Sequence, residues 1–107
     1  MQLIHSTNDG MQFHGHDNLP VWVKVIPHQE GRHPHGDHWQ WIRLDTITAV
    51  IPHLSVQVGD NQAEWQRCLI VETANGRFHP SALLFKGAEI NAPLERLLAA
   101  ISQRYVR

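Results

Sequence analysis

Residues 91–105 read NAPLERLLAAISQRY, and this stretch decides the fold class. Its apolar side chains recur three and four residues apart and form one helical stripe: Leu94, Leu97, Leu98, Ile101 and Tyr105. Pro93 suits the first turn of a helix, and Asn91 suits the capping position before it. The stretch predicts an amphipathic helix over residues 92–105 that lies with one face against the rest of the domain.

The sequence before this helix predicts strands. Valines alternate over residues 21–26, and apolar residues recur at period two over 39–44, 48–51, 54–58 and 65–73. Pro52 is expected to interrupt its run, and Asn75-Gly76 predicts a hairpin turn because both residues accept positive φ. Strands first and a helix last favour an α+β fold: a curved antiparallel sheet of about five or six strands with one C-terminal helix packed on it.

Length and composition limit the classes of protein that fit. The chain has 107 residues, which suits a single domain over residues 1–107. Its net charge is −1 and its lysines and arginines are dispersed, so we expect no nucleic-acid partner. The lone cysteine, Cys68, favours a reducing compartment. No apolar run reaches the roughly 18 residues of a membrane helix, and no signal peptide is recognisable, so we expect a cytoplasmic protein without a membrane partner.

Nine histidines are the unusual chemical feature of this chain. The loop of residues 28–38, HQEGRHPHGDH, is here called the histidine loop. It brings together three imidazoles and one carboxylate, which suit a divalent transition metal: His33, His35, Asp37 and His38. The spacing matches no strong zinc signature, so the alternative is that these are solvated loop side chains.

Two tryptophans follow the histidine loop on one strand face. Trp39 and Trp41 are candidate ligand-binding residues, because aromatic side chains commonly wall a pocket. The alternative is packing in the core or at a dimer interface. Cys68 lies in the middle of a predicted strand, where a small buried apolar role is more usual than that of a nucleophile.

No hydrolase, phosphate-binding or dinucleotide-binding motif is present in the sequence. We therefore expect a small non-enzymatic binding or protein-interaction module. We expect it to form a homodimer, since a second copy would bury the tryptophan surface and the predicted exposed edge of the sheet. The alternative is a histidine-rich protein that binds a divalent transition metal, or a small metal-dependent enzyme.

Overall fold

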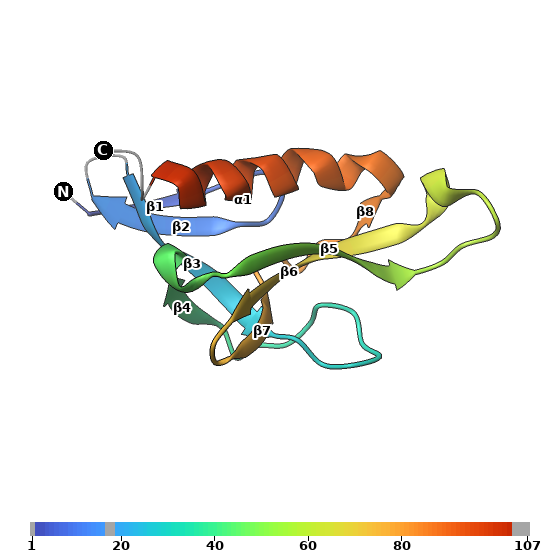
Figure 1. Cartoon of the computed structure of the whole chain (residues 1–107), viewed down its shortest axis with the longest axis horizontal. Helices are drawn as coiled ribbons and strands as arrows, with labels where there is room; N and C mark the ends of the chain where they lie inside the picture. The colour runs from blue at the N-terminus through green and yellow to red at the C-terminus, as the bar shows by residue number, and fades with distance from the viewer. Residues whose placement is uncertain (1, 17–18, 104–107) are drawn as a thin grey trace.

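A computed structural model of the chain describes residues 2–16 and 19–103 (Figure 1). The described residues form a curled antiparallel sheet and one C-terminal helix, which confirms the predicted α+β fold. The elements are β1 (Gln2–Ser6), β2 (Gln12–His16), β3 (Leu19–Pro27), β4 (Gln40–Arg43), β5 (Ala49–Val56), β6 (Gln66–Thr73), β7 (Gly76–His79), β8 (Phe85–Lys86) and α1 (Asn91–Gln103). Six of these strands lie along the main path of the sheet, in the order β1-β2-β3-β7-β6-β5, while β4 pairs with β3 and β8 pairs with β6.

The strand predictions are confirmed for the central strands and wrong at two places. β3, β4 and β6 lie where the alternating residues predicted them. Pro52 does not interrupt its run, because β5 passes through it as one strand paired with β6. Proline is tolerated there because β5 stands at one end of the strand order. An edge strand has a neighbour on one side only, so the missing N–H of Pro52 breaks no hydrogen bond to a second neighbouring strand. The alternating apolar pattern did not predict β1 and β2, of which β2 pairs with both β1 and β3.

The predicted hairpin joins β6 and β7, with its turn one residue earlier than expected. Thr73 pairs with Gly76, so Ala74 and Asn75 form the two-residue turn. Gly76 opens the return strand with a φ of 125°, a value that L-residues rarely adopt. The predicted hairpin is therefore confirmed, but Gly76 is the first residue of the return strand and not part of the turn.

The predicted helix is confirmed, with a different start. Asn91 has helical dihedrals (φ −65°, ψ −37°) and is the first residue of α1, so it is not the cap that we expected. A short 3₁₀ turn, η3 (Gly87–Ile90), leads directly into the helix. Tyr105, the last member of the predicted stripe, lies outside the described residues. Pro93, Leu97 and Ala100 are buried, so this face of α1 packs on the sheet.

The hydrophobic core lies between α1 and one face of the sheet. Its buried side chains come from strands, from the 3₁₀ turns and their flanks, and from the helix: Met11, Phe13, Val23, Val25, Leu44, Ile47, Leu69, Val71, Phe78, Phe85, Ile90, Leu97 and Ala100. Burial of one leucine or valine side chain stabilises a fold by about 1.5–3 kcal/mol. In the part of the chain that the structure describes, no helix is long and apolar enough to span a membrane.

The opposite face of the sheet is also partly covered. Ile26, Cys68, Ile70 and His79 are buried there, although they do not belong to the core below α1. Strand pairing places Ile26 opposite His79 and His53 opposite Cys68. Figure 1 shows the histidine loop on this side of the sheet, away from α1. This second face therefore positions the candidate site.

Candidate functional site

The histidine loop connects β3 to the segment before β4 and is mostly exposed. Gly31 and Gly36 have φ values of 74° and 128°, which let the loop turn sharply. The middle of the loop is held in two ways. Pro34 is buried, and Nδ1 of His33 lies within hydrogen-bond distance, 2.8 Å, of the Ser55 hydroxyl of β5. The loop is therefore tied to the sheet at its centre, while the side chains that follow Pro34 face solvent.

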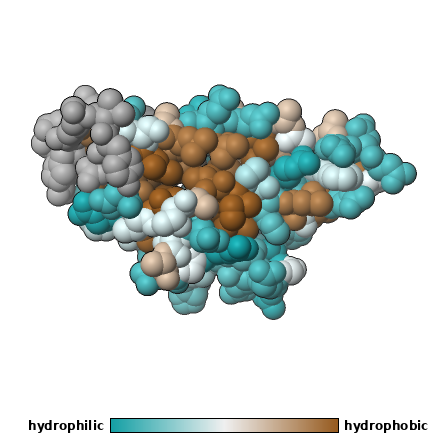
Figure 2. Space-filling model, viewed as in Figure 1, coloured by the Kyte–Doolittle hydropathy of each residue, from teal (hydrophilic) through white to brown (hydrophobic). Residues whose placement is uncertain are grey.

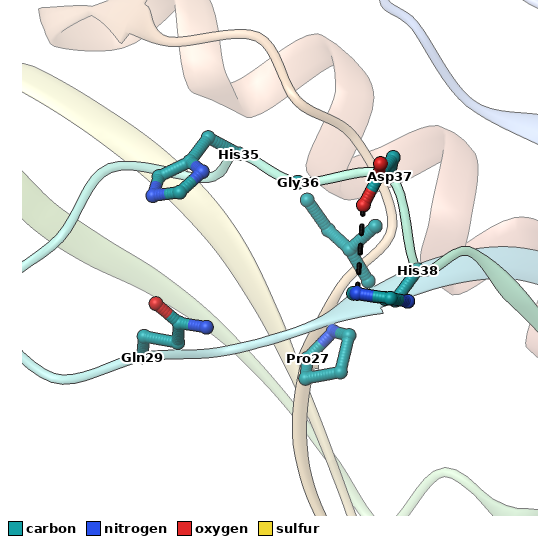
Figure 3. A pocket seen from close by; sticks show the side chains of 7 residues that line it. Pro27, Gln29, His35, Gly36, Asp37 and His38 are labelled. Atoms are coloured by element: carbon teal, nitrogen blue, oxygen red, sulfur yellow. Dashed lines mark ion pairs between the residues drawn. The ribbon is translucent and has the colours of Figure 1, made fainter.

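A pocket of about 520 Å³ lies between the histidine loop and the end of β3 (Figure 3). Its lining residues are Ile26, Pro27, Gln29, His35, Gly36, Asp37 and His38. Figure 3 shows His35 on one side of the opening, with Asp37 and His38 on the other. Nε2 of His38 lies 3.5 Å from Oδ1 of Asp37, and both side chains are more than nine-tenths exposed. The pocket thus has an apolar strand end on one side and a polar, open rim.

The structure brings three of the four predicted metal ligands into this pocket. His35, Asp37 and His38 line it, whereas His33 is bonded to Ser55 away from it. Among residues 2–16 and 19–103, no group of three or more histidine, cysteine or acidic side chains is arranged to hold a metal ion. The predicted ligands therefore share a pocket without forming a ready coordination shell.

The two predicted ligand-binding tryptophans contact other groups. The ammonium of Lys24 lies 5.6 Å from the ring centre of Trp39. The ring of Trp41 lies 5.8 Å from that of His14, and Trp41 is partly exposed. Neither tryptophan is among the residues that line the pocket.

A second group of histidines lies beneath the loop, on the buried part of this face. The buried histidine cluster consists of His28, which follows β3, His53 of β5 and His79 of β7. The ring of His28 lies 4.9 Å from that of His79 and 5.6 Å from that of His53, both edge-on. His79 is 1% exposed and the His28 side chain 6% exposed. Sheet pairing brings together three imidazoles that are far apart in the sequence.

Hydrogen bonds determine where the protons of this cluster lie. Nδ1 of His79 is 2.9 Å from the carbonyl oxygen of Leu69, which can only accept, so His79 carries its proton on Nδ1. Its Nε2 is then free to accept the N–H at Nδ1 of His28, 2.9 Å away. Burial lowers the pKa of His79, and the charges of His28 and His53 lower it further, against the effect of the Leu69 carbonyl. His79 is therefore held as the neutral imidazole.

His28 retains one nitrogen without a hydrogen bond. Its buried Nε2 makes none within the described residues. Oε1 of the exposed Glu30 lies 3.4 Å from this nitrogen, close enough for an ion pair when His28 is protonated. In the neutral ring, Nε2 would present its lone pair to the carboxylate, so these two atoms form no hydrogen bond.

Cys68 is buried as the sequence indicated. Burial raises the pKa of the Cys68 thiol, and a hydrogen bond with Ser55 lowers it by less. A protonated, buried thiol is a poor nucleophile. Cys68 therefore contributes apolar volume beside His53.

Comparison with known proteins gave no match to a family model, to a curated protein or to a solved structure.

Proposed function

We propose that this chain is a non-enzymatic binding module that holds a small ligand in the pocket between the histidine loop and the end of β3. The observation that carries this proposal is the convergence of His35, Asp37 and His38 with Gln29 around one cavity whose strand side is Ile26 and Pro27. Binding sites commonly combine an apolar surface with a few converging polar groups. The ligand class that suits this lining is a small molecule with an apolar part and several hydrogen-bonding groups.

A divalent transition metal is the second candidate ligand. It is favoured by the presence of two imidazoles and one carboxylate in the same pocket, since these groups are usual ligands for zinc, copper and nickel. His35 would have to cross the opening to join Asp37 and His38 (Figure 3). Metal binding would therefore reshape the loop, which a binding experiment can detect.

One experiment tests both ligands on protein purified without a tag. Saturation-transfer NMR with a mixture of small alcohols, amines and carboxylates reports organic ligands, and calorimetric titration with zinc chloride reports metal. We expect fragment binding that is lost in the double variant His35→Ala/His38→Ala. His14→Ala is the matched control, since His14 lies on β2, outside the pocket.

The outcomes separate the two candidates. Zinc binding that Asp37→Asn and His38→Ala each weaken, without fragment binding, would favour the metal. Neither fragment nor zinc binding, or binding that the double variant leaves intact, would contradict a ligand site in this pocket.

We also propose that the module is a homodimer. An apolar patch formed by Val50, Leu54, Leu94, Leu98 and Ile101 borders the core along β5 and α1. Figure 2 shows hydrophobic residues gathered in the middle of this face, between the helix and β5. The five side chains of the patch carry no charge, and Arg67, the cross-strand neighbour of Leu54, borders one end of it, so two copies can meet through the apolar centre of the patch. The buried, unpaired Cys68 supports a reducing compartment, such as the cytoplasm, as the place where it works.

A further inference from the structure

The buried histidine cluster lies where the histidine loop leaves the sheet. His28 is the first residue of the loop, and its backbone N–H donates to the Arg77 carbonyl oxygen of β7 at 3.0 Å. Its side chain bonds to His79 on the same strand. Gln29, the next residue, lines the pocket. Any change at the His28–His79 pair therefore acts directly on one wall of that pocket.

The His28–His79 pair has room for one additional proton. A proton on Nε2 of His28 would point toward the Glu30 carboxylate, 3.4 Å away, and leave the bond to His79 intact. When His28 already carries that proton, a second proton on Nε2 of His79 would face the N–H at Nδ1 of His28 across 2.9 Å. Two donors cannot share that distance, so the hydrogen bond would break and two cationic rings would repel each other.

We propose that the His28–His79 hydrogen bond is an acid-sensitive contact that holds the start of the histidine loop on the sheet and releases it when His79 takes up a proton. Release moves Gln29 and opens the pocket. The contact itself rests on the geometry of the two rings, and only its effect on ligand binding rests on the proposed function.

The groups around the pair support this direction. His53 of β5 lies beside His28, so its protonation adds positive charge to a cluster that is already crowded. Cys68 of β6 stands opposite His53 and adds no negative charge, because burial raises the pKa of its thiol. Glu30 is exposed and lies beside Nε2 of His28, on the side away from His79, so it does not face the nitrogen of His79 that bonds to His28.

Two variants keep a hydrogen bond between residues 28 and 79 in acid, the first by removing the titrating ring at residue 79 and the second by accepting either form of His79. In His79→Gln, the amide oxygen replaces Nε2 as the acceptor for His28. In His28→Asn, the amide donates to neutral His79 and can rotate to accept from protonated His79. His33→Asn is the control, because His33 is the other imidazole that ties the loop to the sheet, through Ser55. Two variants are used so that a folding defect in one does not decide the result.

Hydrogen exchange by NMR measures the protection of the residue 28 amide at about pH 7.5 and about pH 4, because the pKa of His79 lies below the ordinary histidine value of about 6.5. After correction for intrinsic exchange, we expect the wild type to lose protection of this amide at the lower pH, because release of the loop opens its hydrogen bond to the Arg77 carbonyl oxygen. The amides of α1 should keep their protection. His33→Asn should behave as the wild type, and the two cluster variants should lose the acid effect.

Equal protection at both pH values would overturn the acid-sensitive contact, as would an acid effect that survives in His79→Gln and His28→Asn. An acid effect lost only in His33→Asn would assign the release to the Ser55 contact instead. The exchange data do not depend on a ligand. If the loop opens in acid but the fragment mixture and zinc do not bind, the contact stands and the proposed function fails.

Discussion

At the scale of single residues, His79 has the largest chemical consequence in this molecule. It is 1% exposed, and both of its ring nitrogens lie within 2.9 Å of a partner. A buried imidazole with this arrangement is stabilised in its neutral form. His79 therefore links the stability of the fold to pH.

Stability should fall as the pH falls through the histidine range, and His79 should account for part of the fall. The pKa of His79 is lower in the folded chain, mainly because of burial. The unfolded chain therefore takes up this proton first, below about pH 6.5, and the stabilisation present above that pH is lost progressively toward the folded pKa. One such group changes the free energy of unfolding by up to about 1.4 kcal/mol per pH unit.

Urea unfolding followed by tryptophan fluorescence at several pH values measures this dependence. His79→Gln should give a shallower curve than the wild type, because residue 79 no longer titrates. The other eight histidines are the same in both proteins, so the difference reports on His79 together with its interactions with His28 and His53. Parallel curves would show that His79 is protonated equally in the two states.

The sequence drew attention to histidines that are neighbours along the chain. His35, Asp37 and His38 do share a pocket, since a short loop keeps them close whatever the fold is. The buried histidine cluster escaped prediction because its members are 25 and 26 residues apart, and only the pairing of β3 with β7 and of β5 with β6 brings them together. Pairing of this kind depends on strand order, which a single sequence does not specify.

At the scale of elements, the predictable parts are those with a regular apolar pattern. β3, β6 and α1 each bury one periodic set of side chains against the core, and that periodicity is visible in the sequence. β1 and β2 read QLIHS and QFHGH, with too few alternating apolar residues to predict strands. β2 pairs with β3 and β1 pairs with β2, and these contacts between strands are not recorded in the local pattern.

One polar contact joins the β1–β2 turn to the helix. The Asp9 carboxylate is almost buried, and it accepts hydrogen bonds from Arg96 of α1 and from the Thr7 hydroxyl. The Asp9 carbonyl accepts a further bond from Ser81 at 2.7 Å. The same residue thus ties together three segments that are distant in the sequence.

Asp9→Ala should destabilise the fold by about 1–3 kcal/mol, because it leaves the partly buried Arg96 and Thr7 donors without their acceptor. Glu72→Ala is the matched control. It removes the pair with Arg77, whose atoms are 2.9 Å apart on a more exposed surface, and should cost about 0–1 kcal/mol. Urea unfolding at neutral pH compares the two variants. Equal losses would show that burial of the Asp9 pair adds nothing to its contribution.

At the scale of the whole molecule, the two faces of the sheet have different roles. One face packs under α1 and supplies the core, while the other holds the histidine loop, the pocket and the buried histidine cluster. The binding surface proposed for a ligand is therefore separate from the apolar patch proposed for a second copy. Ligand binding and dimerisation can be tested independently for the same reason.

The apolar patch has a geometry that favours side-chain contacts in the proposed dimer. Arg96 pairs with Asp9 on one flank of α1, and the helical period places Leu94, Leu98 and Ile101 on the opposite flank. Pro52 stands in the middle of β5 and has no N–H for a further ladder. A second copy would therefore meet the patch through apolar side chains instead of extending the sheet, and this limits growth beyond a dimer.

Leu98→Asp should weaken dimerisation at least about tenfold, since it places a charge beside its own symmetry mate in the centre of an apolar interface. Leu98 is 45% exposed in the single chain, so the substitution should leave the fold intact. Ala99→Asp is the control, because residue 99 is exposed on the outward side of the helix. Light scattering coupled to size exclusion over a wide range of concentration gives the mass of each variant. A wild type that stays monomeric at every concentration contradicts the dimer, and equal weakening by both substitutions would place the interface elsewhere on α1.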